Sequence, residues 1–161
     1  MKVKIIGAGS IGNHLAQAAR RKGWQVTVVD NDPEALCRMR EDIYPTRYGE
    51  WDGSIELYES GTTEPKGGFD IIMIGTPPDG RMFLAAEALS EEPKLLHLEK
   101  PLCEPGLQGI HEFKHALTKS STLVTVGYDH AVSESIEFVA NLLSNEVAGE
   151  AITLDVEFRE H

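Results

Sequence analysis

A glycine-rich hexapeptide near the amino terminus has the composition of a loop that binds phosphate groups. Gly7-Ala8-Gly9-Ser10-Ile11-Gly12 directly follows the apolar run Val3–Ile6. In such a loop the first glycine permits a tight turn, the second lets the backbone approach a diphosphate, and the third lets the next helix pack close to the strand. We expect that helix to begin near Ser10, so that its free N–H groups, including that of Ile11, face the phosphates.

A carboxylate at the end of the next apolar run indicates which dinucleotide binds. Asp30 closes the predicted strand Gln25–Val29, 18 residues beyond Gly12. A carboxylate in this position accepts hydrogen bonds from the hydroxyl groups of the adenosine ribose and repels a 2′-phosphate. Asn31 and Asp32 supply no cation for such a phosphate. The sequence therefore predicts NAD as the cofactor, with NADP as the less favoured alternative.

A glutamate and a lysine follow a later apolar run, where the reactive ring of such a cofactor would lie. Glu99-Lys100-Pro101 comes directly after Lys94–Leu98. An ammonium group near an alcohol or carbonyl oxygen polarises it, stabilises a developing alkoxide and relays its proton. For Lys100 to act as a base, its pKa must be lowered. Lys100 and Glu99 are the predicted catalytic residues; the alternative is an exposed lysine at a strand that Pro101 ends.

Strands and helices alternate along residues 1–127, which predicts the α/β class. The expected strands are Val3–Ile6, Gln25–Val29, Ser54–Tyr58, Phe69–Ile74, Lys94–Leu98 and Thr122–Val126. Two of the expected helices begin at Ser10 and at Asp32, and the one that begins at Asp32 reaches Ile43. The other two span Arg81–Leu89 and Leu107–Lys119. Apart from Ser54–Tyr58, residues 44–68 show no clear pattern. This alternation predicts a Rossmann doubly wound parallel sheet with helices on both faces.

The pattern changes after Gly127. Residues 133–143 have a narrow apolar stripe at helical spacing, and residues 151–160 alternate strictly between apolar and polar types. One such strand is not stable by itself. We therefore expect residues 128–161 to be the beginning of an incomplete α+β domain for substrate binding or dimerisation, in a truncated chain or in a homodimer that pairs through 151–160. The residues expected at that interface are Ile152, Leu154, Val156 and Phe158.

Composition excludes several classes of partner. The chain has 161 residues, of which 41% are hydrophobic and 25% charged, and its net charge is −11. This negative charge argues against nucleic acid or an anionic membrane as a partner. Only Cys37 and Cys103 are present, and no segment resembles a signal peptide or membrane span, so a cytoplasmic protein is expected. His97, His111 and His115 lack ligand spacing, so no metal site is predicted.

The motifs resemble those of the Gfo/Idh/MocA oxidoreductases, which include glucose–fructose oxidoreductase and inositol dehydrogenase. The similar elements are the glycine hexapeptide, Asp30, Gly75-Thr76-Pro77-Pro78, Glu99-Lys100-Pro101 and Gly127-Tyr128-Asp129-His130. The resemblance implies that Thr76 and Pro77, with Gly75 beside them, line the nicotinamide ribose side of a cofactor site. It also implies that Glu99 and Lys100 contact that ribose and the substrate, and that the bond before Pro101 is often cis.

The chain also departs from that family. The family's Asp-x-x-x-His arrangement does not occur after Gly127. Asp129-His130-Ala131-Val132 stands where the family often has Asn-(His/Arg)-Arg-Phe, so a usual arginine is absent. His130 is interpreted as a loop residue and His161 as a chain end. The predicted function is that of an NAD-dependent oxidoreductase acting on a small hydroxyl or carbonyl compound, such as a sugar or cyclitol. The alternative is an NAD-binding module or sensor without a complete active site.

Overall fold

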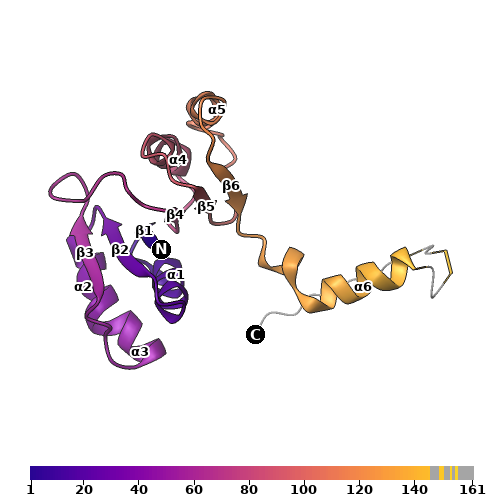
Figure 1. Cartoon of the computed structure of the whole chain (residues 1–161), viewed down its shortest axis with the longest axis horizontal. Helices are drawn as coiled ribbons and strands as arrows, with labels where there is room; N and C mark the ends of the chain where they lie inside the picture. Colours follow the sequence, from indigo (N-terminus) through magenta and orange to yellow (C-terminus); the bar gives the residue numbers. More distant parts are fainter. Residues whose placement is uncertain (146–148, 151–152, 154, 156–161) are drawn as a thin grey trace. The chain divides into compact units, whose positions relative to one another are not determined.

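The computed structural model describes residues 1–145, 149, 150, 153 and 155. The chain divides into two compact units, Met1–Gly127 and Tyr128–His161, and each is described separately below (Figure 1).

The first unit is built on one parallel sheet of six strands in the order β3-β2-β1-β4-β5-β6 (Figure 1). The strands are β1 (Lys2–Ile6), β2 (Gln25–Asp30), β3 (Ile55–Glu59), β4 (Ile71–Ile74), β5 (Leu95–Leu98) and β6 (Leu123–Val126). The strand order reverses between β1 and β4, which pair directly with Val3 opposite Ile71. This confirms the predicted Rossmann sheet, with strands that differ from the expected ones by a residue or two at their ends.

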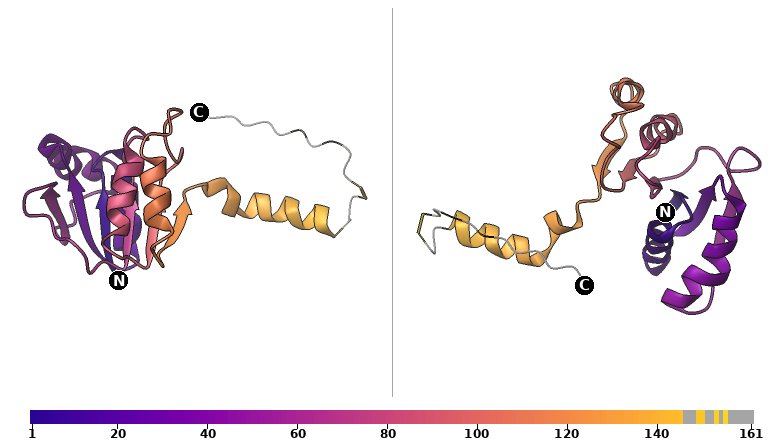
Figure 2. Two further views of the ribbon diagram at one scale, coloured as in Figure 1. Left: turned by 90° about the horizontal axis from the view of Figure 1, so that it is seen from above. Right: turned by 180° about the vertical axis from the view of Figure 1, so that it is seen from behind.

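Helices connect most of the strands. They are α1 (Ser10–Arg21), α2 (Pro33–Arg38), a π-helical turn η1 (Met39–Ile43), α3 (Tyr44–Tyr48), α4 (Arg81–Leu89) and α5 (Ile110–Leu117). The aligned helices α4 and α5 lie side by side (Figures 1 and 2). Each of the four expected helices is present, although α5 is shorter than the predicted Leu107–Lys119.

The second helical segment continues to Tyr48, where no element was expected. Pro45 has no N–H to donate, and the backbone before it widens into the π-helical turn. Tyr44 is buried, and its ring lies 5.1 Å from that of Trp51 and 5.2 Å from that of Tyr48, centroid to centroid. These aromatic contacts stabilise α3 through tertiary packing, which local periodicity does not reveal.

The two faces of the sheet carry separate cores. Neighbouring residues of a strand point to opposite faces. Accordingly, Ile71 belongs to the core under α1 and α2, whereas Ile72 and Ile74 belong to the core under α4 and α5. The first core lies mainly over β1–β3 and the second over β4–β6. Helices thus cover both faces of the sheet, as predicted.

The connection from β3 to β4 has no helix and is held to the sheet by ions instead. Lys4 of β1 is 1% exposed. Its Nζ lies 2.7 Å from a carboxylate oxygen of Glu91 and 3.5 Å from one of Glu64, and it donates to the carbonyl of Pro65. Burial raises the pKa of Glu64, but hydrogen bonds from Lys66 and Gly61 outweigh it and lower that pKa to about 2. This buried ion cluster fixes the crossover connection in place.

The second unit contains a short 3-10 helix η2 (Asp129–Val132) and α6 (Glu134–Ser144). The hydroxyl of Ser133 caps α6 by accepting the N–H of Ile136. The expected strand 151–160, apart from Thr153 and Asp155, lies outside the described residues, as do Ile152, Leu154, Val156, Phe158 and His161. Among the described residues, no helix combines the length and apolar character needed to cross a membrane.

Candidate functional site

The carboxyl ends of four strands form a continuous row of loops. The first amide after each strand donates to a carbonyl of one of the last two residues of the strand beside it. These hydrogen bonds join Gly7 to Val29, Gly75 to Ile6, Glu99 to Ile74 and Gly127 to Leu98, at 2.8–3.1 Å. The row includes the point where the strand order reverses, which is where doubly wound sheets bind ligands. We call residues 7–12 the glycine loop, 75–78 the proline loop and 99–101 the lysine loop.

The glycine loop has a shape that only glycine allows at two of its positions. Gly7 has a φ of +106°, a conformation that side chains disfavour. A Cβ added at Gly12 would lie 1.8 Å from the carbonyl oxygen of Gly7, so α1 can approach β1 only without a side chain there. A Cβ at Gly9 would meet no atom within 4 Å. The loop therefore packs closely against the protein at Gly7 and Gly12 but is open at Gly9, and this opening leaves room for a diphosphate.

Asp30 orients the glycine loop. One of its carboxylate oxygens accepts the N–H of Ala8 at 2.7 Å, and the other accepts the N–H of Asp32 at 2.9 Å. Asp32 instead caps α2 by accepting the N–H of Glu34 at 2.9 Å. The two acids therefore have different tasks. Each oxygen of Asp30 retains lone pairs that can accept ribose hydroxyl groups.

An arginine that the sequence analysis missed lies at the start of α1. Arg47 of α3 donates through Nη1 to the hydroxyl oxygen of Ser10 at 2.9 Å and to its carbonyl oxygen at 3.2 Å. The same nitrogen lies 3.2 Å from Nε2 of His14. Its charge adds to the positive end of the helix dipole. Arg47 was overlooked because no element was expected at residues 44–48.

The proline loop packs directly on the glycine loop. A Cβ at Gly75 would lie 3.1 Å from Cγ2 of Ile11 and 3.3 Å from the amide nitrogen of Gly12. A Cβ at Gly7 would lie 3.1 Å from both Cγ2 and the amide nitrogen of Thr76. The predicted residues of these two loops therefore come together, with Pro77 exposed at the surface beside Thr76.

The lysine loop places its two charged side chains differently. The peptide bond between Lys100 and Pro101 is cis, as the family resemblance implies. Lys100 is exposed, and no described residue bonds to its ammonium group. A carboxylate oxygen of Glu99 lies 3.2 Å from where a Cβ of Gly127 would stand, so it points toward β6. Glu99 and Lys100 therefore do not form an ion pair with each other.

His97 of β5 lies next to Glu99. Its Nε2 is also 3.2 Å from the Cβ position of Gly127, and its Nδ1 is 3.0 Å from the hydroxyl oxygen of Thr125. Burial lowers the pKa of His97, which favours the neutral ring at pH 7. Within the described part of the chain, no group of His, Cys, Asp and Glu side chains could hold a metal ion.

A second missed residue, Arg81, links the proline and lysine loops. It begins α4, and its guanidinium donates to the carbonyl oxygens of Thr76, Glu99 and Pro101. Arginine is usually assigned to the surface, but a signal was present: Arg81, Ala85 and Ala88 fall on the buried stripe of α4.

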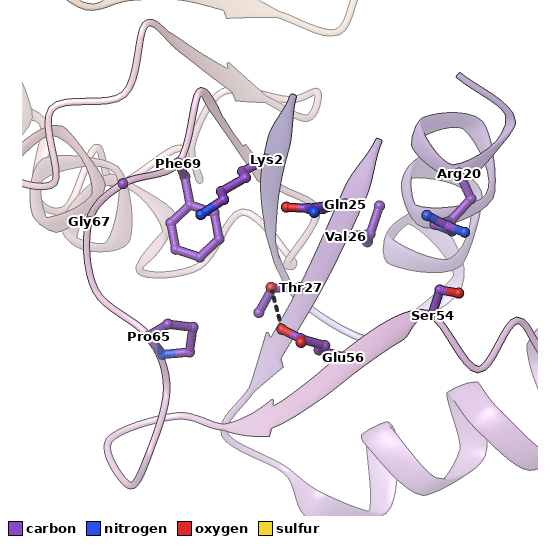
Figure 3. Close-up of a pocket in the computed structure, with 11 residues that line it drawn as sticks. Lys2, Arg20, Gln25, Val26, Thr27, Ser54, Glu56, Pro65, Gly67 and Phe69 are labelled. Carbon is purple, nitrogen blue, oxygen red and sulfur yellow. Dashed lines mark hydrogen bonds between the residues drawn. The ribbon is translucent and has the colours of Figure 1, made fainter. Parts of the chain in front are cut away.

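One cavity among the described residues lies away from these loops. It has a volume of about 470 Å³ and is lined by the amino ends of the strands and by the crossover connection (Figure 3). Thr27 and Glu56 point into it, and the Thr27 hydroxyl oxygen lies 3.4 Å from a carboxylate oxygen of Glu56 (Figure 3). Phe69 forms the opposite wall (Figure 3). Because the predicted site residues are at the carboxyl ends, this cavity is separate from them.

Comparisons with known proteins agree with the sheet and with the glycine loop. The family model described as the TrkA-N domain matches residues 3–95, which is more than half of the chain. This match covers the glycine loop, Asp30 and the proline loop, and it ends before the lysine loop. No curated protein matches the chain by sequence.

Solved structures share the fold at low sequence identity. The myo-inositol dehydrogenase of Lactobacillus casei, solved with NAD(H) and myo-inositol, is 22% identical with a TM-score of 0.69, over 92% of this chain and 42% of that one. The WlbA dehydrogenase of Chromobacterium violaceum, with NADH and UDP-GlcNAcA, is 18% identical with a TM-score of 0.68, over 91% and 40%. The biliverdin reductase of Synechocystis, with biliverdin and NADP+, is 15% identical with a TM-score of 0.63, over 89% and 42%. The chain thus spans less than half of their length.

Proposed function

Because this chain belongs to the TrkA-N domain family, a family of Rossmann NAD-binding domains, we propose that Met1–Gly127 binds a nicotinamide dinucleotide. The observation that carries this proposal is the glycine loop, which is closed toward the protein at Gly12 and open to solvent at Gly9. The amino end of α1 and the guanidinium of Arg47 supply positive charge at that opening. A diphosphate fits both the shape and the charge.

The proposed cofactor is NAD rather than NADP. The Asp30 carboxylate is already oriented by the N–H groups of Ala8 and Asp32, so it can accept ribose hydroxyl groups without rearranging. A 2′-phosphate at the same place would meet a fixed negative charge. Proteins with this fold have been solved with NAD(H) and with NADP+, so the fold itself does not select between them.

The proposed reaction is an oxidation or reduction at a hydroxyl or carbonyl carbon of a small molecule such as a sugar or cyclitol. When bound, the nicotinamide ring supplies hydride transfer. The exposed ammonium group of Lys100 would polarise the substrate oxygen and hold or pass its proton, and the Glu99 carboxylate would orient the ribose. The dehydrogenases with the same fold support this reaction class, but the lysine loop lies outside the family match.

A second candidate function is that of an NAD-binding module or sensor without catalysis. The observation that favours it is the isolation of Lys100, whose ammonium group contacts no described residue that would orient it. The two candidates share the cofactor site and differ only in what the lysine loop does. The strand 151–160 remains our predicted contact for a homodimer in either case.

Titration calorimetry with NAD and NADP tests the cofactor proposal. The wild-type chain should bind NAD more tightly, and Asp30→Asn should reduce NAD affinity about tenfold while NADP affinity stays equal or improves. The matched control is Asp32→Asn, which removes the neighbouring carboxylate but leaves the one that faces the ribose. Tighter binding of NADP by the wild type, unchanged in Asp30→Asn, would contradict the choice of NAD.

A further inference from the structure

Arg81 carries a buried positive charge that no carboxylate pairs with. The residue is 1% exposed, and no ion pair of the described residues includes it. Its guanidinium instead donates to three backbone carbonyls, those of Thr76, Glu99 and Pro101. A buried charge is costly unless hydrogen bonds compensate it. These acceptors compensate the two Nη groups, whereas Nε has no hydrogen-bond partner among the described residues.

The acceptors belong to two loops that no other described side chain joins by hydrogen bonds. Thr76 lies in the proline loop after β4, and Glu99 and Pro101 lie in the lysine loop after β5. Because a guanidinium is planar and holds its donors in a rigid fork, it fixes the direction of each carbonyl it contacts. A lysine in its place could reach the same region but could not reproduce that fork. The contact therefore controls main-chain conformation, and through it the side chains of both loops.

The glycine loop is held by other contacts. Gly7 donates to the carbonyl of Val29, and Ala8 donates to Asp30. Neither contact includes Arg81. Loss of the guanidinium should consequently disturb the proline and lysine loops much more than the loop that faces the diphosphate.

We propose that Arg81 is a positioning residue for the nicotinamide half of the cofactor. It holds Thr76 and Pro77 in register with Glu99 and Lys100, so that the two loops form one wall on which the nicotinamide riboside rests. This inference rests on the proposed binding of a nicotinamide dinucleotide. It adds that recognition of the two halves of that molecule is separable, and that one buried side chain governs only the second half.

The test compares two probes that differ in the nicotinamide riboside. ADP contains only the adenosine and the diphosphate, whereas NADH also carries the second ribose and the nicotinamide ring. Calorimetry on the wild type should show tighter binding of NADH than of ADP. In Arg81→Met, the ratio of the two affinities should fall about tenfold or more, while ADP affinity changes by less than about twofold.

Two controls separate this effect from general damage. Arg20→Met removes another arginine that bonds to a backbone carbonyl, that of Trp24, but at the far end of α1. It should leave the ratio unchanged. Circular dichroism and thermal unfolding of each variant establish that it is folded. Arg81→Lys keeps the charge without the fork, and it should lower the ratio nearly as much as Arg81→Met.

Several results would overturn the inference. An unchanged ratio in Arg81→Met, an equal loss for both probes, or equal wild-type affinity for both probes would each show that Arg81 does not position the nicotinamide half. If the wild type binds neither probe, the proposed function fails and the inference fails with it.

A measurement on the wild type covers the case in which neither Arg81 variant folds. Amide hydrogen exchange at Gly75, Thr76 and Glu99 should slow more with NADH than with ADP. Equal slowing by the two probes would contradict the role assigned to Arg81.

Discussion

The two ends of the candidate site are built in opposite ways. The glycine loop depends on residues that have no side chain. Gly12 lies so close to the carbonyl of Gly7 that any Cβ there would clash with it. The proline and lysine loops depend on one long side chain, because the Arg81 guanidinium reaches the carbonyls of both. Close approach of two backbones is rigid and intolerant, whereas a side chain that ties loops together can be shortened without a clash. The two ends should therefore respond differently to substitution.

Gly12→Ala should have the largest effect on stability. The added Cβ would stand 1.8 Å from the carbonyl oxygen of Gly7, and a backbone oxygen cannot move aside cheaply. We expect the free energy of unfolding to fall by about 4 kcal/mol or more, together with loss of dinucleotide binding. Urea denaturation measures the first effect and calorimetry the second. A folded Gly12→Ala chain of near wild-type stability would show that α1 can retreat from β1.

Glu64→Gln tests the buried ion cluster in which Lys4 of β1 contacts Glu64 and Glu91. The folded-state pKa of Glu64 is lowered to about 2, so its charge stabilises the fold above the ordinary pKa and this contribution is lost as pH falls from about 4.5 to 2. Glu64→Gln should be less stable than wild type by about 2 kcal/mol at pH 7, with the difference shrinking below pH 4.5.

The control for the buried ion cluster is Glu41→Gln. The pKa of Glu41 is also lowered, mainly by a hydrogen bond from Arg40, but this ion pair is exposed. Exposed pairs contribute little, so denaturation curves of Glu41→Gln and wild type should nearly coincide at every pH. A difference between wild type and Glu64→Gln that stays constant from pH 7 to 2 would show that the Glu64 carboxylate does not carry the effect through its charge.

Gly127→Ala probes the end of the site held by Arg81. Its Cβ would lie 3.2 Å from both a carboxylate oxygen of Glu99 and Nε2 of His97, which are side-chain atoms that can shift. The stability loss should be only about 1 kcal/mol, measured by urea denaturation. NADH affinity should fall while ADP affinity does not. A loss as large as that of Gly12→Ala would erase the contrast between the two ends.

Gly9→Ala should affect stability least. No atom lies within 4 Å of its added Cβ, so the free energy of unfolding should change by less than about 0.5 kcal/mol. The methyl group nevertheless stands in the opening proposed for the diphosphate, so the affinity for ADP should drop at least about tenfold. Unaltered ADP binding would place the diphosphate elsewhere.

Periodicity and turn chemistry predicted the sheet because they are local properties. Short apolar runs that end in glycine, such as the one before Gly75, marked the buried parallel strands. Because Asp30 and the glycine loop each follow a predicted parallel strand, and the carboxyl ends of parallel strands share one edge of a sheet, the sequence also predicted that they lie close together. The extension of the second helix to Tyr48 was missed because its stability comes from packing on Trp51 rather than from its own sequence.

The roles of Arg47 and Arg81 were missed for a related reason. Each arginine donates to groups that are distant in the chain, and backbone carbonyls carry no signature in the residue type. Arg81 reaches Glu99 and Pro101 only because β4 and β5 are adjacent in the sheet. Lys100 could be singled out by its neighbours Glu99 and Pro101, but its exposed ammonium group could not be inferred from them.

The ion cluster around Lys4 has a consequence for behaviour on heating. Hydration of charged groups becomes less favourable as temperature rises, so the free-energy cost of burying these charges away from water declines. The stabilisation from apolar burial increases little over the same range. Lys4 and its two carboxylates are also too enclosed for dissolved salt to screen them effectively. The crossover connection should thus be among the last surface segments to loosen in a melting experiment, and added sodium chloride should scarcely advance its release.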